Sequence, residues 1–347
     1  MSTKTLPITI PPIIGYTVHA YPLTVAFSSQ KCLPWFYSNY IQMISNTEYD
    51  GVFLDFLTLC NILNGGKWVD FLFPGIPWLK CCPVGDFIIT KCNLDIHSLI
   101  TNALNENNYV VIFLDEFYIP NRRTYQKSNF YHENFIFGYD TAEKTYDILG
   151  FDERRLFNSG KVSYHELEQG FKSNHLTDPE AASIKLLKLD TTFSYELDLQ
   201  FIRDSLLDYV NSQNTCNLQN IVRNPMKKCV YGLNTYHELI RYFELLYDNS
   251  IRYDIRPIHI LWEHKKTMLL RIEYLSKMYP EAGFNEVYEQ YIVIEQKCLS
   301  LRQALIKYSI SKQPSHIKNI IATLKFVSEM EREILNQLIY KIQPLIV

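Results

Sequence analysis

Residues 131–152 read YHENFIFGYDTAEKTYDILGFD, and this stretch decides the fold. Two runs rich in aromatic and β-branched residues flank the polar residues 140–144, a pattern typical of a β-hairpin. The far ends of hairpin strands lie side by side, so we expect His132 next to Asp152. A histidine held by a carboxylate is half of a nucleophilic triad, and the rest of the chain must supply the nucleophile.

A second acid on the returning strand is Asp147, which lies 15 residues after His132. Hairpin pairing places Asp147 opposite Phe137 or Gly138, away from the imidazole, and therefore favours Asp152 as the acid of the triad. Asp147 remains open as the alternative.

The bulk composition is that of an ordinary globular protein, with 47% hydrophobic and 20% charged residues. At 347 residues the chain is long enough for two domains. A formal net charge of -3 offers no basic excess for nucleic acid, and no apolar run approaches the ~20 residues that cross a membrane. Residues 1–16 are broken by prolines and lack a signal-peptide pattern, so we expect a cytoplasmic protein.

Cysteine usage fits that expectation, because none of the eight cysteines forms a CxxC pair. We therefore expect reduced thiols and neither structural zinc nor another metal site.

Cys32 stands out among the cysteines. It precedes Pro34 and an apolar helical face, so it lies at or just before a helix N-terminus, where unpaired N–H groups favour a thiolate. The alternative is a small buried thiol without reactivity.

Upstream of the hairpin the pattern is mixed. Residues 1–25 predict an extended lead-in or an edge strand, residues 51–67 a short helix ended by two glycines, and residues 110–114 a strand buried on both faces. After the hairpin, Ser163 and Glu166 form a capping box that predicts a helix start.

From residue 193 onward the pattern is helical almost throughout. Thr235 and Glu238 suggest another capping box, and Pro257 suits the first turn of a further helix. Apolar stripes with steps of three and four residues predict a helix bundle. The stripes comprise Leu261, Met268, Ile272 and Leu275; Phe284, Val287, Tyr291, Ile294, Cys298, Leu301, Leu305 and Tyr308; and Ile317, Ile320, Leu324, Val327, Ile334 and Leu338. We therefore expect an α+β protein, with an antiparallel sheet in residues 1–192 and a helical domain in residues 193–347.

The residues HENFIFGYD, with Gly138 and Tyr139 six and seven residues after the histidine, resemble the histidine hairpin of papain-like cysteine peptidases. The stretches VVIFLDEFYIP and SYHELEQGF resemble the branch that contains the N-terminal domain of butirosin biosynthesis protein H. YGLNTYHELIRYF and RPIHILWEHKKTMLLRIEYL resemble the helical half of that group. The resemblance implies a papain-like domain over 1–192, with Cys32 as nucleophile, His132 as base and Asp152 as orienting acid.

The chain departs from that pattern at the oxyanion hole. Papain-like peptidases usually have a glutamine about six residues before the cysteine, and this chain has Ala26 there. Gln30 is nearer to Cys32, but its side chain can point elsewhere, so we expect the hole to depend mainly on the backbone N–H of Cys32.

The resemblance also implies an activity. Enzymes of this branch move an acyl group from the phosphopantetheine thioester of an acyl or peptidyl carrier protein, through an acyl-cysteine, to a small amine. This chain would thus be an ATP-independent amide synthetase of natural-product biosynthesis, with no cofactor of its own and no nucleic-acid or membrane partner.

Two alternatives remain: a cysteine peptidase or amidase with the same triad, and a non-catalytic interaction protein. The sequence leaves open the acyl group, the amine, the carrier and the oligomeric state. It also leaves open whether the basic residues meet an acidic carrier or are solvated; these are Arg122, Arg123, Lys227 and Lys228.

Overall fold

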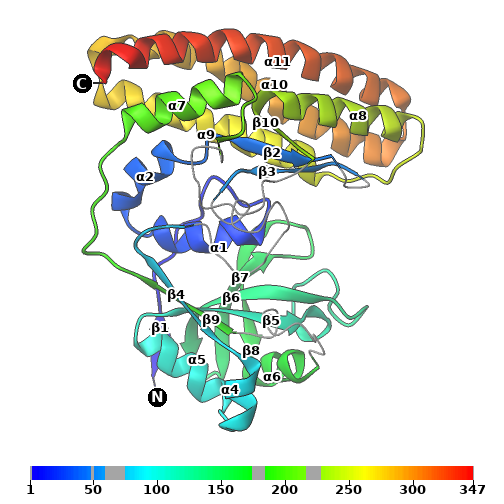
Figure 1. The fold of residues 1–347 in the computed structure, drawn as a ribbon. Coiled ribbons are helices and arrows are strands. Elements are labelled where there is room, and N and C mark those ends of the chain that lie inside the picture. Colours follow the sequence, from blue (N-terminus) through cyan, green and yellow to red (C-terminus); the bar gives the residue numbers. More distant parts are fainter. Residues whose placement is uncertain (1, 48–50, 59–74, 174–183, 216–227, 347) are drawn as a thin grey trace. The chain divides into compact units, whose positions relative to one another are not determined.

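The computed structural model describes most of the chain, which combines helices with antiparallel sheets and confirms the α+β class (Figure 1). The described residues are 2–47, 51–58, 75–173, 184–215 and 228–346. None of the helices within these ranges is both long and apolar enough to cross a membrane.

The chain divides into two compact units, and each unit contains two stretches of sequence. The first unit comprises Met1–Gln30 and Asp70–Ser194, and the second comprises Lys31–Val69 and Tyr195–Val347. The sequence led us to expect one boundary after residue 192. The structure has a boundary after Ser194 and two others, after Gln30 and after Val69. These two arise because Lys31–Val69 belongs to the second unit.

The first unit is built on a seven-stranded antiparallel sheet with the strand order β4-β9-β5-β6-β7-β8, and β1 pairs with β6. The strands are β1 (Thr3–Thr5), β4 (Leu79–Val84), β5 (Tyr109–Asp115), β6 (Tyr131–Asp140), β7 (Thr145–Phe151), β8 (Phe157–Ser163) and β9 (Ile184–Leu189). The helical segments are α1 (Thr17–Ala26), α4 (Asp86–Lys91), α5 (Ile96–Asn105), η2 (Glu116–Tyr118) and α6 (Tyr164–Lys172).

Strands β6 and β7 form the predicted hairpin inside this sheet. Gly138 pairs with Asp147, which confirms the predicted position of Asp147. The other edge of β6 pairs with β5, and Leu114 lies opposite His132. The end of β5 and the residue that follows it, Glu116, are therefore brought beside the histidine.

Helix α1 was not predicted from the sequence. The expectation of extended chain over residues 1–25 is right for β1 but wrong for this helix. All ten residues of α1 are buried, and the ring of Tyr21 stacks on Phe135 with their centroids 5.3 Å apart. A helix buried on every side has no polar face, so hydrophobic periodicity does not reveal it. Pro22 inside the helix also argues against a helix in the sequence.

The second unit contains a helical bundle and a small antiparallel sheet with the strand order β10-β2-β3. Its early segment contributes η1 (Gln30–Cys32, whose first residue belongs to the first unit), α2 (Leu33–Ser38), β2 (Met43–Asn46) and β3 (Phe53–Phe56). Its later segment contributes α7 (Leu199–Val210), β10 (Cys229–Tyr231), η4 (Gly232–Asn234), α8 (Thr235–Tyr247), α9 (Arg256–Met278), η5 (Pro280–Ala282), α10 (Phe284–Ser311), α11 (Pro314–Ile342) and η6 (Gln343–Leu345). The helix expected over residues 51–67 is wrong where β3 forms, and residues 59–67 lie outside the described ranges.

Local helix signals were confirmed in part. Ser163 and Glu166 form the predicted capping box at the start of α6. The helix predicted after Thr235 is confirmed as α8, but the predicted capping box is wrong. α8 begins at Thr235 without a side-chain cap, and Glu238 forms an ion pair with Arg241 instead.

The long apolar stripes are confirmed, because every predicted stripe residue on α9, α10 and α11 is buried. Two stripes skip one helical turn. On α9 that turn carries His264 and Lys265, and on α11 it carries Glu331. All three side chains are completely buried, so the skipped turns also belong to the core.

Lys265 and Glu331 meet in a cluster that we call the polar node. Nζ of Lys265 lies 2.8 and 2.9 Å from the two carboxylate oxygens of Glu331. The hydroxyls of Tyr209 on α7, Tyr236 on α8 and Tyr291 on α10 donate to the same carboxylate. Each of the five helices α7 to α11 therefore contributes one group to the polar node.

Candidate active site

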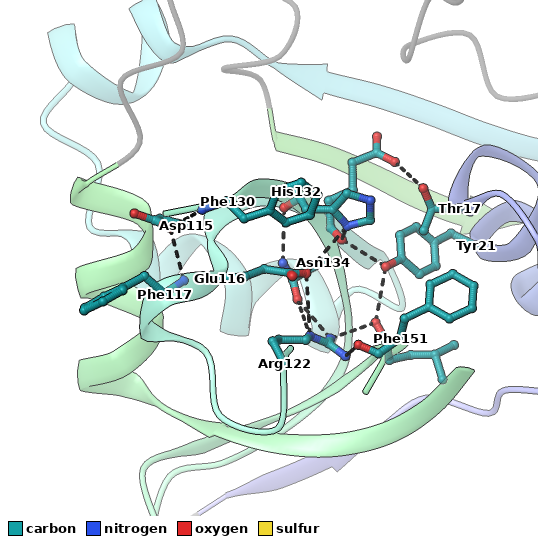
Figure 2. A network of polar contacts seen from close by, with 12 residues as sticks. Thr17, Tyr21, Asp115, Glu116, Phe117, Arg122, Phe130, His132, Asn134 and Phe151 are labelled. Atoms are coloured by element: carbon teal, nitrogen blue, oxygen red, sulfur yellow. Dashed lines mark hydrogen bonds and ion pairs between the residues drawn. The ribbon is translucent and has the colours of Figure 1, made fainter. Parts of the chain in front are cut away.

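His132 lies at the start of β6 and is held by contacts on one ring nitrogen. Its Nδ1 is 3.1 Å from the carbonyl oxygen of Glu133 and 3.6 Å from Oε1 of Glu116 (Figure 2). The ring of Phe130 stacks on the imidazole with centroids 5.4 Å apart. The His132 side chain is 34% exposed, so the ring is fixed while part of it remains accessible.

These contacts imply one tautomer of His132. A carbonyl oxygen can only accept a hydrogen bond, so Nδ1 carries the proton and donates it to the carbonyl of Glu133. In the neutral ring Nε2 then keeps its lone pair. Within the described part of the first unit, no residue forms a hydrogen bond with Nε2. His132 is thus arranged to accept a proton at Nε2, as a general base must.

The pKa of His132 is raised above its ordinary value by nearby carboxylates. Burial alone would lower it, because desolvation disfavours the charged imidazolium. The negative charge of Glu116, whose Oε1 lies 3.6 Å from Nδ1, and the charge and backbone carbonyl of Glu133 together outweigh this effect. Glu116 is therefore the carboxylate that acts most strongly on His132.

A buried arginine supports this arrangement. Nε of Arg122 is 3.8 Å from Oε1 of Glu116, and its Nε and Nη2 donate to Oδ1 of Asn134 at 3.2 and 2.9 Å. Its Nη1 donates to the carbonyl of Phe151 at 3.1 Å. Gly150 provides the space, since a Cβ there would lie 2.7 Å from Nη2. Arg122 is only 5% exposed, so the expectation of a solvated or carrier-facing charge is wrong for this residue.

The side chain of Glu133 has partners of its own. Nζ of Lys185 on β9 donates to its Oε1, and Oγ1 of Thr17 on α1 donates to its Oε2, both at 3.2 Å. The hydroxyl of Tyr21 donates to its backbone carbonyl at 3.0 Å (Figure 2). The charge of Glu133 is thus compensated by a buried lysine.

Asp152 lies where the hairpin register leads, because continuing the β6–β7 pairing by three residues places it opposite His132. Its carboxylate is engaged in the turn after β7. Oδ1 accepts the backbone N–H groups of Arg154 and Leu156, each at 2.9 Å. Asp147 binds elsewhere, to the Thr5 hydroxyl and Lys161. The carboxylate that the structure brings to the imidazole is that of Glu116, on the other side of β6.

Cys32 belongs to the second unit, whereas His132 and Asp152 belong to the first. Cys32 ends η1 and is the N-cap of α2, which confirms its predicted position at a helix start. The predicted activation is wrong. Burial raises the pKa of the Cys32 thiol to about 12, and a backbone hydrogen bond offsets this only in part. The thiol is 1% exposed and is therefore neutral near pH 7.

Helix α2 is held at its other end by a buried arginine of α9. Nε of Arg271 donates to the carbonyl of Tyr37 at 2.8 Å, and Nη2 donates to those of Asn39 and Tyr40 at 2.6 and 3.0 Å. These carbonyls lie at the C-terminal end of α2 and just beyond it, where α-helices leave acceptors unpaired. Arg271 therefore fixes the short helix that Cys32 begins.

The residues near the expected oxyanion hole lie in α1 and η1. Ala26 is the last residue of α1 and offers no side-chain donor, and Gln30 is the exposed first residue of η1. The backbone N–H of Cys32 remains the expected donor.

Glu116 is the residue that sequence reasoning missed. Its position is the signal: it comes two residues after the buried run of residues 110–114 and directly after β5, which pairs antiparallel with the start of β6. A polar residue just past β5 must therefore lie near His132.

Comparison with known proteins adds no assignment, since no protein-family model and no curated protein matches this chain. The functional argument therefore depends on the chemistry of the residues themselves.

Proposed function

We propose that this protein is a cysteine-dependent acyltransferase that forms an amide from a carrier-bound thioester and a small amine. Cys32 is the nucleophile and His132 is the base. The observation that carries the proposal is the state of His132, whose Nδ1 proton is held by a carbonyl while Nε2 is available for proton transfer. The papain-like fold and the amide-forming outcome are the parts of the proposal that come from the resemblance of the hairpin.

The first half-reaction transfers the acyl group to the enzyme. The proton of the Cys32 thiol moves to Nε2 of His132 as the sulfur attacks the thioester carbonyl. The bond between the acyl carbon and the carrier sulfur breaks, and the imidazolium returns the proton to the departing thiolate. Because burial keeps the resting thiol neutral, this proton transfer accompanies the attack rather than preceding it.

In the second half-reaction the amine attacks the acyl-Cys32 carbonyl and loses a proton to His132. The carbon–sulfur bond breaks, and the Cys32 thiolate regains a proton from the imidazolium. A thioester is converted to an amide without any change of oxidation state, and this direction is downhill, so the reaction needs no ATP. Exclusion of water from the acyl-enzyme separates this outcome from hydrolysis.

The test is acylation of the intact protein by an acyl-pantetheine thioester, followed by mass spectrometry. We expect a mass gain of one acyl group on the wild type and on Cys82→Ala, an exposed control cysteine, and none on Cys32→Ala. His132→Ala should slow the gain. Adding a primary amine should speed loss of the adduct and produce the amide. No adduct on the wild type, or the same adduct on Cys32→Ala, overturns the proposal, and loss at equal rates with and without amine indicates a hydrolase.

A further inference from the structure

We propose that Glu116 is the positioning residue of His132, in place of the acid at the end of the hairpin. Its contribution to a reaction rests on the proposed function, whereas its interaction with the imidazole does not. The contact that motivates the proposal is the 3.6 Å separation between Oε1 of Glu116 and Nδ1 of His132.

The backbone around Glu116 is firmly held. Its N–H donates to the carbonyl of Phe130 at 2.8 Å. The preceding residue, Asp115, is completely buried, and its Oδ1 accepts the backbone N–H groups of Phe117 and Phe130 at 3.1 and 3.0 Å (Figure 2). Asp115 thus ties the turn that carries Glu116 to the chain two residues before His132. The backbone from which the Glu116 side chain extends toward His132 is therefore fixed by the fold.

The other charged groups around His132 are already engaged. Asp115 accepts the Asn129 side-chain amide, the two backbone N–H groups and the Ser173 hydroxyl. These hydrogen bonds together hold its pKa below the ordinary value, although burial would raise it. Glu133 is paired with Lys185 on β9, and Asp152 caps the turn after β7. From α1, the nearby titratable group is the hydroxyl of Tyr21, which is bound to a carbonyl. Oε1 of Glu116 lies 3.8 Å from Nε of Arg122 and 3.6 Å from Nδ1 of His132.

This geometry assigns separate tasks to two neighbours of the ring. The carbonyl of Glu133 receives the Nδ1 proton and fixes the tautomer. Glu116 lies beyond ordinary hydrogen-bond distance and acts mainly through its charge. Its effect grows when His132 takes up a proton, because a carboxylate stabilises the imidazolium more than the neutral ring. Glu116 therefore favours the step in which the thiol loses its proton.

The experiment is an NMR titration of the His132 imidazole in the full chain, with its signal assigned by its loss in His132→Gln. We expect Glu116→Gln to shift the midpoint of His132 to lower pH, because it removes the negative charge at nearly constant size. Asp152→Asn is the matched control, since an amide oxygen can still accept the two N–H groups of the turn, and it should leave the midpoint unchanged. An unchanged midpoint in Glu116→Gln, or a larger shift in Asp152→Asn, overturns the proposal.

A second variant guards against loss of the fold, because Arg122 loses its carboxylate in Glu116→Gln. Glu116→Asp keeps the charge, so its midpoint should lie between those of the wild type and Glu116→Gln. In the acylation assay, a less basic His132 moves the acidic limb of the pH profile to lower pH and lowers its plateau. If the wild type forms no adduct, the proposed function fails, while the titration still decides the role of Glu116 by itself.

Discussion

Replacing Lys265 by methionine should destabilise the second unit by about 3–5 kcal/mol, the usual consequence of leaving one member of a buried ion pair without its partner. Methionine fills a similar volume, so the loss comes from charge and hydrogen bonds and not from a cavity. The change leaves the completely buried Glu331 carboxylate without its cationic partner. It also removes the donor that Nζ supplies to the Tyr209 hydroxyl at 2.7 Å and to Nδ1 of His264 at 3.1 Å.

Two further variants distinguish the loss of the ion pair from the effect of changing a lysine as such. Glu331→Gln in the Lys265→Met background removes the uncompensated negative charge but keeps an oxygen that can accept hydrogen bonds from the tyrosines. The double variant should therefore be more stable than the sum of the single changes predicts, with a coupling of about 0.5–3 kcal/mol. Lys266→Met is the matched control. Lys266 is half-buried and lies over the ring of Trp262, so its loss should amount to less than about 1 kcal/mol.

Urea unfolding followed by far-UV circular dichroism measures these differences, since the second unit supplies most of the long helices. The reasoning is refuted if Lys265→Met unfolds within about 1 kcal/mol of the wild type. It is also refuted if the two changes add without coupling, because the polar node would then not be one connected cluster.

Three further predictions concern single residues. Gly232→Ala should destabilise by about 1–3 kcal/mol in the same assay, because Gly232 has a φ of 53° and a Cβ would meet the backbone of Tyr209; an equally stable variant would contradict that strain. Burial holds the pKa of His264 well below its ordinary value, so the folded chain stays unprotonated there while the unfolded chain takes up a proton. The free energy of unfolding should therefore fall by up to about 1.4 kcal/mol per pH unit as pH drops below about 6.5, and His264→Gln should remove this part of the acid sensitivity in urea titrations at several pH values. At pH 8, iodoacetamide should alkylate Cys32 at least about tenfold more slowly than exposed Cys82 by peptide mass mapping, because burial suppresses its thiolate; equal rates would contradict a raised thiol pKa.

The features that the sequence predicted correctly are those set by local periodicity. The hairpin of β6 and β7 combines two β-rich runs with a polar turn, and Gly138 lies opposite Asp147 as predicted. The register then shifts between Gly138 and Ile136. The stripe on α10 is complete from Phe284 to Tyr308, because a helix with one buried face must repeat every three or four residues.

The features that it missed depend on contacts made elsewhere in the chain. Helix α1 is enclosed by the core and carries no periodic signal. The residues 53–56 look helical by composition but form β3, because β2 offers a partner strand. The turns at Lys265 and Glu331 carry no apolar residue of the two separate stripes. They are complementary, and only the folded bundle brings Nζ of Lys265 within 2.8 Å of the Glu331 carboxylate, so that one charge compensates the other.

The choice between Glu116 and Asp152 shows the same limit at the site. Hairpin register fixes which backbone positions are opposite, but it does not fix where a carboxylate finds its donors. Asp152 stands at a strand end, where the unpaired N–H groups of the following turn are the nearest donors, and its Oδ1 takes two of them. Glu116 directly follows β5, and its backbone N–H donates to the carbonyl of Phe130. Its carboxylate therefore approaches the imidazole from the β5 side of β6. The acid that assists a histidine on a strand can therefore come from either neighbouring strand. Here it is Glu116, because its carboxylate does not cap a turn and its charge can stabilise the imidazolium.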